Sequence, residues 1–495
     1  MEALPNAGRS GVAPVDLDRR TKFEILGAIL LALFLGALDQ TIVSVAMPVI
    51  GTELNGLDLY VWVTTIYLLT STISVPFYGK LGDLYGRRPL LMIGITIFLI
   101  GSVLSGLSQS MEQLILFRGV QGLGAGALFP ISLAVIGDLF TPAERGKYQG
   151  LFGAVFGISA LVGPALGGLI TETIGWHWVF FVNLPLGLIS LFIIWRYMPT
   201  LRVAGASRSL DYLGGLVFMV GVSLLLVGLS NKQTGEWTDL TVGGFTLAGL
   251  VLSAVFFFIE SRAAEPIVPP ALFRSRTYAG SIVATFLAAF GFFGAIVFLP
   301  LWFQSVHGSS ATESGYQILP LLIGLIGGAT ISGALVSRTG KYKAILLGAL
   351  AVMALGLGLM TQLHATTPLP ILWVWMFLAG LGVGPTFSVF TVVIQNGVPV
   401  EKLGVATSNL TFFRQIGGSV GLAIAGTLFG SALRDQLPVQ LRAQGTPEPF
   451  IAQLQQAIAA GSGGFDVRGV GDLGARLRAV LPPEALPFVE QLVAA

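Results

Sequence analysis

Two charged residues lie inside long apolar segments of this sequence, where a charge usually has a function. Asp39 lies near the middle of the segment 24–50, and Arg118 lies in a later segment. A charged side chain at the centre of a bilayer costs about 2.5–3.5 kcal/mol on insertion scales. Burial favours the neutral form of a carboxyl group, which would suit Asp39 to take up and release a proton. The alternative is a structural carboxyl group that is hydrogen-bonded to another helix or to its chain neighbours, Gln40 and Thr41.

Two arginine residues lie within the apolar segments. Arg118 is the only basic residue in the interior of the first six of them, since Arg196 lies at the cytoplasmic end of the sixth. An arginine beside a cavity changes the protonation of a nearby carboxylate through its charge, and the alternative for Arg118 is a structural clamp on backbone carbonyl groups. Arg414 lies closer to the end of its segment, so its side chain is predicted to extend towards water.

A short loop after the second apolar segment combines glycine with charged residues. It contains Gly79, Gly82, Asp83, Gly86, Arg87 and Arg88. Glycine allows tight turns, and charged side chains can bridge to the ends of neighbouring helices. Because breaking such bridges would favour one conformation of the protein over another, we predict a gating role for this loop. Positive charge that merely anchors the loop is the alternative for the arginines, but it does not explain Asp83.

Small residues cluster in the fifth apolar segment, and aromatic residues are spread over several segments. The small residues predict close helix packing and a hinge at the proline; they are Gly157, Gly163, Pro164, Gly167 and Gly168. The aromatic residues could line an apolar pocket, although such side chains more often face lipid; the candidates are Phe129, Phe156, Phe293 and Trp302.

The composition restricts the class of protein. Hydrophobic residues make up 54% of the 495 positions and charged residues 11%, which is about half the charged share of a soluble domain. Mean hydropathy is +0.82. The chain has no Cys, and its His residues are scattered without the spacing of metal ligands. The basic residues form no patch for nucleic acid, and no phosphate-binding loop occurs. These features argue against a soluble enzyme, an ATP-driven pump and a nucleic-acid-binding protein.

Thirteen apolar segments are long enough to cross a bilayer, which takes about 20 residues. They are 24–50, 60–79, 89–108, 113–137, 148–172, 178–198, 209–230, 240–260, 277–303, 314–336, 343–363, 369–396 and 404–433. The short alternating pattern of a membrane β-barrel is missing from the sequence. We therefore predict an all-α polytopic membrane protein.

Lys and Arg predict the orientation of this chain in the membrane. If the N-terminal segment 1–23 is cytoplasmic, the loops on that side hold nearly all the interspan Lys and Arg, and the loops on the other side hold only Lys232. Positive residues mark the cytoplasmic side of a membrane protein. We predict a multi-pass protein of the inner or plasma membrane with a cytoplasmic N-terminus.

The loop 79–88 has a weaker copy at 333–341, after the tenth segment. The two align at one constant offset through Gly79 and Gly333, Leu81 and Leu335, and Gly86 and Gly340. Such duplication is typical of secondary transporters that bind substrate between two halves. It predicts an N-terminal six-helix half at 24–200, an inserted helix pair with linkers at 201–276, and a C-terminal half at 277–433.

Four motifs in order resemble the fourteen-span drug:proton antiporter family of the major facilitator superfamily, the EmrB/QacA-like multidrug efflux transporters. Residues 38–48 resemble its first-span motif, 79–88 its cytoplasmic loop, and 118–125 its fourth-span motif, and the glycines from Gly157 to Gly168 resemble its fifth-span motif. The resemblance covers residues 24–433. It implies the major facilitator fold, a proton-coupling role for Arg118 and, as in most relatives, a monomer.

The sequence departs from the pattern of that family at three places. Ser44 stands where the family usually has Asn, and His177 stands where Arg is common. Both leave the substrate preference open. Residues 434–495 are polar and contain no further span, so they resemble the extracytoplasmic loop before a fourteenth span. We interpret this last span as missing.

The resemblance and the motifs together predict a proton-coupled antiporter that exports hydrophobic or cationic drug-like compounds by alternating access. Its partners would be these small molecules, protons and the lipid bilayer, and it would use no cofactor because protons drive it. The alternative is a proton-coupled exporter of one endogenous lipid, siderophore or secondary metabolite, because the motifs do not encode the ligand. A membrane receptor is a third hypothesis, which ligand binding without proton movement would support.

Overall fold

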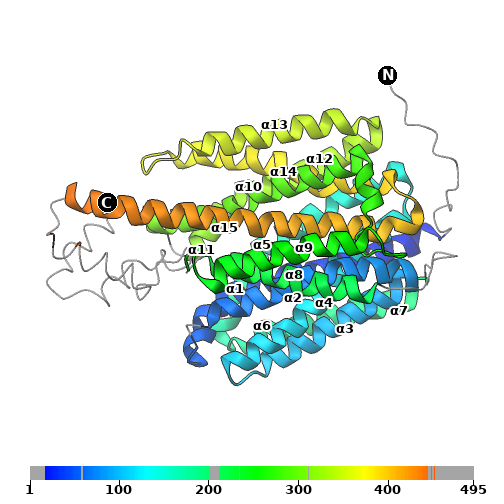
Figure 1. Cartoon of the computed structure of the whole chain (residues 1–495), viewed down its shortest axis with the longest axis horizontal. Coiled ribbons are helices and arrows are strands. Elements are labelled where there is room, and N and C mark those ends of the chain that lie inside the picture. Colours follow the sequence, from blue (N-terminus) through cyan, green and yellow to red (C-terminus); the bar gives the residue numbers. More distant parts are fainter. Residues whose placement is uncertain are drawn as a thin grey trace.

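The computed structural model describes residues 17–56, 59–200, 211–232, 235–309 and 311–443, together with Glu448 and Ile451. Every regular element in this part of the chain is a helix, which confirms the all-α prediction. The long helices run side by side in an elongated bundle (Figure 1). In that view α12–α14 lie at one side of the bundle and α3, α6 and α7 at the opposite side.

The helices follow one another with short connections. They are α1 (Arg19–Glu53), α2 (Tyr60–Tyr85), α3 (Arg87–Gly106), α4 (Met111–Leu139), α5 (Pro142–Thr173), α6 (His177–Phe181), α7 (Asn183–Tyr197), α8 (Tyr212–Asn231), α9 (Phe245–Glu260), α10 (Arg276–His307), α11 (Ala311–Gln317), α12 (Leu319–Thr339), α13 (Tyr342–Met360), α14 (Leu369–Gly397) and α15 (Leu403–Ala443). A π-helical turn, η1 (Leu240–Gly244), leads into α9, and the short 3₁₀ turns η2 (Pro270–Arg274) and η3 (Val400–Lys402) precede α10 and α15.

Each predicted span lies in one of these helices or in two consecutive ones. Twelve helical segments of the described part are long and apolar enough to cross a membrane. The segment predicted at 60–79 lies in α2, which is 26 residues long. A helix of this length exceeds the about 20 residues that a bilayer requires.

The helix that contains the last predicted span is longer than that span. The span was predicted at 404–433, the candidate span in the structure is Leu403–Phe429, and α15 continues through Pro438 to Ala443. Leu, Gln, Arg and Ala dominate the added turns and are strong helix formers, so the proline and the charges there did not end the helix. The rest of the predicted tail, apart from Glu448 and Ile451, lies outside the described residues.

Glycine makes the sharp turn that the repeat predicts. Gly86 separates α2 from α3 with a φ of 97°, and Gly340 separates α12 from α13 with a φ of 66°. Both lie in the left-handed region, which a residue with a Cβ rarely adopts. The aligned residues Gly86 and Gly340 therefore have the same structural role: each reverses the direction of the chain at the same end of the bundle. We call it the 79–88 end.

The helices group by their contacts. Helices α1–α7 form a first group and α10–α15 a second, and α8 packs on α9; within each group the helices pack mainly on one another, except α5, which packs on α12 as well as on α1. Helices α5 with α12 and α2 with α15 form the main contacts between the first group and the second. Residues 201–210 lie outside the described part, and the boundaries predicted at 200 and 276 stay predictions.

Glycine lets neighbouring helices approach closely in the second group. A Cβ atom added at Gly380 of α14 would collide with the Leu321 carbonyl oxygen of α12, and one at Gly328 of α12 would collide with Leu381 of α14. Membrane helices associate through such backbone contacts because lipid offers no hydrophobic drive between them. Glycine at these places is therefore a packing requirement.

We expect Gly380→Ala to destabilise the protein by about 1–3 kcal/mol, because the added methyl group overpacks the contact between α12 and α14. Thermal unfolding of the purified protein in detergent measures this effect. Gly348→Ala in α13 is the matched control, since nothing lies within 4 Å of a Cβ there. Equal unfolding temperatures for the two variants would contradict this account.

Candidate functional site

Three helices bring a charged cluster together in the interior of the first group. Asp39 of α1 is fully buried, and its carboxylate accepts hydrogen bonds from Arg118 Nη1 at 2.6 Å and Gln121 Nε2 at 2.8 Å, both on α4. Asn183 Nδ2 of α7 donates a third bond at 3.0 Å. The same asparagine also donates to Ser102 Oγ of α3 at 3.0 Å. The carboxylate therefore accepts from three donors, on two different helices.

The surroundings of Arg118 hold the guanidinium in place on two sides. Arg118 Nη1 also donates to Gln121 Oε1 at 2.7 Å. The guanidinium carbon lies 4.1 Å from the centre of the Tyr67 ring of α2, within the range of a cation–π contact. Arg118 is 1% exposed. A buried ion pair of this kind is strongly coupled, because removing either partner leaves an unpaired charge in the interior.

The structure thus joins the two residues on which the proton-coupling hypothesis depends. Of the alternatives for Asp39, the bonds to other helices are present. Thr41 donates instead to backbone oxygens, among them Ser159 of α5 at 3.0 Å. The sequence analysis missed Gln121 and Asn183. A signal existed for Gln121, which lies three residues after Arg118 and so faces the same side of the helix.

Asp83 joins the two groups of helices at the 79–88 end. Its carboxylate accepts from the backbone N–H groups of Gly404 at 2.9 Å and Val405 at 2.8 Å, at the start of α15. A carboxylate is stabilised at a helix N-terminus by the free N–H groups and the helix dipole. Arg87 pairs with Asp83, and its Nε donates to Asp138 of α4 at 3.1 Å. This buried arrangement is called the Asp83 clamp below.

Further polar contacts close the same end. Arg145 of α5 donates to Asn396 Oδ1 of α14 at 2.8 Å, and Gln149 of α5 donates to Gln395 Oε1 at 2.7 Å. The sequence analysis did not find these residues, since nothing in their spacing shows that α5 and α14 meet. Lys80 of α2 pairs with Glu265, after α9, at 2.6 Å.

Not every residue of the predicted gating loop takes part in these contacts. Gly79 lies against Ser408 and Gly404 of α15, where a Cβ would collide. Its aligned partner in the repeat, Gly333, lies in the same way against Gly146 of α5. Arg88, in contrast, donates to the Trp195 carbonyl oxygen of α7 at 2.6 Å, within its own group. The gating prediction therefore concerns Asp83 and Arg87 more directly than Arg88.

The glycines of α5 face two different helices. A Cβ at Gly163 or Gly167 would meet α1 at Thr41 or Ile42, whereas one at Gly157 would meet Ile326 of α12. The face towards α12 also includes glycines that the sequence analysis missed, namely Gly146, Gly150 and Gly153. Nothing lies near Gly168, and Pro164 lies inside a continuous helix. Helix α5 therefore connects the helix of Asp39 to the second group.

Three of the four aromatic residues that were predicted to line a pocket lie in one chain of ring contacts. Phe129 of α4 and Phe156 of α5 lie with ring centres 5.2 Å apart, and Phe156 reaches Phe387 of α14 at 6.2 Å. Phe293 contacts Phe292, which in turn reaches Phe387 at 6.3 Å. We call these five rings the aromatic cluster. Trp302 was predicted to join them but lies against Phe303 and His307, near the other end of α10.

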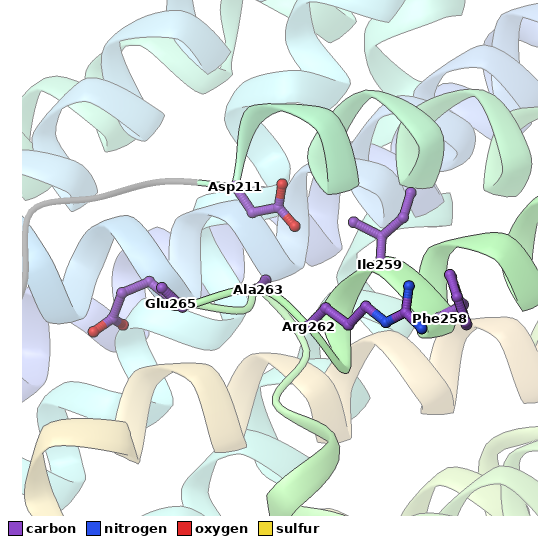
Figure 2. Close-up of a pocket in the computed structure, with 7 residues that line it drawn as sticks. Asp211, Phe258, Ile259, Arg262, Ala263 and Glu265 are labelled. Atoms are coloured by element: carbon purple, nitrogen blue, oxygen red, sulfur yellow. The ribbon is translucent and has the colours of Figure 1, made fainter.

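A pocket of about 410 Å³ lies elsewhere, beside the connection after α9. Figure 2 shows Arg262 lying against Phe258, with Asp211 on the opposite wall and the Glu265 carboxylate pointing away. None of the aromatic cluster lines this pocket. The pairing of Lys80 with Glu265 places it at the 79–88 end, and we assign it no role in the candidate site.

We expect Asp83→Asn to open the 79–88 end, because charge-assisted hydrogen bonds to α15 contribute about 1.5–3 kcal/mol. This corresponds to an increase of about tenfold to a hundredfold in the population of the open form. The chain has no Cys. A cysteine introduced at the buried Ser408 therefore reports opening through its rate of reaction with a thiol reagent. Glu401→Gln, which removes an exposed acid near the same interface, is the control; equal rates in both variants would rule out the clamp.

Comparisons with known proteins agree with this architecture. Residues 29–422 match the Major Facilitator Superfamily. The chain is 39% identical over 440 residues to the multidrug transporter protein MdtP of Bacillus subtilis, covering 88% of this chain and 81% of that one. It is 36% identical over 433 residues to the tetracenomycin C resistance and export protein of Streptomyces glaucescens, covering 87% and 80%.

Solved structures show the same fold. The human organic anion transporter MFSD10 aligns with a TM-score of 0.61 at 15% identity, over 82% of this chain and 94% of that one. The proton:xylose symporter XylE aligns with a TM-score of 0.57 at 15% identity, over 96% and 97%. The chain therefore belongs to the major facilitator superfamily, and its function is transport rather than catalysis.

Proposed function

We propose that this chain exports hydrophobic drug-like compounds, cationic ones included, in exchange for protons. Relatives named for multidrug transport and for resistance and export support the first part of this proposal. The observation on which the proton exchange depends is the buried cluster of Asp39, Arg118, Gln121 and Asn183. The proposal places the protein in a cell membrane with its N-terminus and the 79–88 end in the cytoplasm, as Lys and Arg predict.

Proton uptake at Asp39 would change the contacts between α1 and α4. The carboxylate now accepts from Arg118 at 2.6 Å. A proton on Asp39 removes the negative charge, so that Arg118 keeps Gln121 and the rings of Tyr67 and Phe180 but has no charged partner. Because an unpaired charge in the interior is costly, the protonated cluster favours a rearrangement of these helices.

Helix α5 can transmit such a change to the second group. Thr41 lies two residues after Asp39, donates to Ser159 of α5 and packs on Gly163. The opposite face of α5 packs on α12 through Gly146 and Gly150, where the two backbones meet. A movement of α1 therefore reaches the interface between the groups through close helix contacts, which leave little room for side chains to absorb it.

Alternating access requires an open and a closed form of the 79–88 end, and the Asp83 clamp stabilises the closed form. It closes the 79–88 end in this structure through the start of α15. Export requires this end to open so that a compound can enter from the cytoplasm, and then to close again. The aromatic cluster lies between the two groups and offers ring faces from both, since Phe156 and Phe387 belong to different groups. We place substrate binding there.

We expect Asp39→Asn to abolish proton flux that is triggered by substrate, because the amide cannot take up and release a proton. The full chain is reconstituted into proteoliposomes with an imposed pH gradient, and lipophilic cations and neutral drugs are added to start the flux. Glu172→Gln, an exposed acid at the end of α5, is the matched control and keeps the flux of the parent. Exchange of substrate between the two sides, with no pH gradient, continues in both variants.

The other outcomes decide between the hypotheses. Proton flux that persists in the Asp39→Asn variant would show that another residue carries the coupled proton. Flux for one compound class alone would favour the exporter of a single endogenous lipid, siderophore or secondary metabolite. Ligand binding without any proton movement or exchange would contradict the transport proposal.

A further inference from the structure

Arg414 is a buried cation without an acidic partner. It lies on α15 and is 5% exposed, although the sequence predicted a side chain that extends to water. Nη2 donates to the Thr386 carbonyl oxygen of α14 at 3.1 Å. Nε and Nη1 are buried and have no acceptor, and none of the ion pairs in the described part of the chain involves Arg414. Burying a charge in this way is costly unless a partner of opposite charge arrives.

The contrast with Arg118 shows what is missing. Arg118 has a carboxylate at 2.6 Å, and this pair cancels its charge. Arg414 has only a carbonyl oxygen and the face of Phe387, whose ring centre lies 4.3 Å from the guanidinium carbon. The interior of the transporter therefore carries one positive charge that its own described side chains do not neutralise.

Arg414 borders the aromatic cluster. Phe387, on which its guanidinium lies, contacts Phe156 of the first group at 6.2 Å. One turn further along α15, a Cβ at Gly418 would meet the ring of Phe293. Two further buried polar atoms on α15 and on its neighbour α10 also have no partner in the described part of the chain, Gln415 Oε1 and Thr285 Oγ1. The unpaired nitrogens of the Arg414 guanidinium thus lie beside the ring of Phe387, where we place substrate.

We propose that Arg414 binds an anionic oxygen, a carboxylate or a phenolate, of a transported compound whose aromatic body packs on the aromatic cluster. This inference rests on the proposed export function and names its substrate class. A guanidinium hydrogen-bonds anionic oxygens strongly and also stacks on aromatic rings, so it suits a planar anionic compound. Arg414 repels positive charge, so this position takes the anionic members of the exported compounds, and a cationic member would bind away from Arg414.

Equilibrium binding to the full chain in detergent tests this assignment. The probes are a pyrene dye whose single ionisable group is a carboxylate and the methyl ester of that dye, which share the aromatic body and differ in the anionic oxygen. We expect the parent to bind the acid about tenfold to a hundredfold more tightly than the ester, the range for a hydrogen bond to a charged group. Equal affinity of the parent for the two dyes would overturn the proposal without the need for any variant.

Variants locate the effect at Arg414. We expect Arg414→Met to remove the preference for the acid while its affinity for the ester stays within about threefold, since only the acid loses a partner. Arg414→Lys keeps the positive charge but lacks the planar set of N–H donors of the guanidinium, so we expect it to retain part of the preference for the acid. Lys402→Met, which removes an exposed cation near the start of α15, keeps the full preference. A loss of affinity for both dyes to the same extent in Arg414→Met would show a structural role instead.

The binding data and the flux data separate this inference from the proposed function. If the dyes drive proton flux but the acid is not preferred, the export proposal stands and the role of Arg414 falls. If the acid is bound through Arg414 but Asp39→Asn leaves proton flux intact, the substrate class stands and the coupling at Asp39 falls.

Discussion

The ion pair between Asp39 and Arg118 is the constraint on which the rest of this interior depends. Two charges removed from water are tolerated only when their attraction and their hydrogen bonds offset the loss of hydration. Here Gln121 and Asn183 supply the further bonds, so three side chains from α4 and α7 depend on one carboxylate of α1. A change in the charge of that carboxylate is felt by the whole cluster, because each donor is itself buried and would lose the negative charge of its acceptor.

Close contacts at glycine residues transmit a change at the ion pair to distant helices. Helix α5 meets the backbone of α1 at Gly167 and the backbone of α12 at Gly146 and Gly150. Where backbones meet in this way, a helix moves as a body, because no flexible side chain lies between. The repeat shows the same kind of close contact. Gly79 lets α2 approach α15, and Gly333 lets α12 approach α5. The two groups of helices therefore meet through related surfaces, and the Asp83 clamp is a polar addition to one of them.

The sequence predicts features that are local or repeated along the chain, but it does not predict contacts that depend on how the helices are arranged. The helices follow from hydropathy, and Asp39 and Arg118 stand out because charge is rare in their segments. Gln149 and Gln395 could not be paired in advance, since they lie far apart in the chain and each resembles an ordinary polar residue. Trp302 was assigned to a pocket by type alone, and its position along α10 takes it away from the cluster. Arg414 was misjudged because its distance from the segment end suggested access to water, whereas Phe387 and Thr386 cover it.

The charge of the substrate determines how much of the membrane potential an exporter can use. Exchange of a monovalent cation for one proton moves no net charge, so only the pH gradient would drive it. Export of a monovalent anion against one proton moves two charges in the favourable direction when the cytoplasm is negative. At 100 mV the movement of one charge supplies about 2.3 kcal/mol, so the movement of two charges supplies about 4.6 kcal/mol. An unneutralised arginine beside the substrate cluster, together with an acid that is reserved for the proton, would thus select the compounds that such a potential expels most strongly.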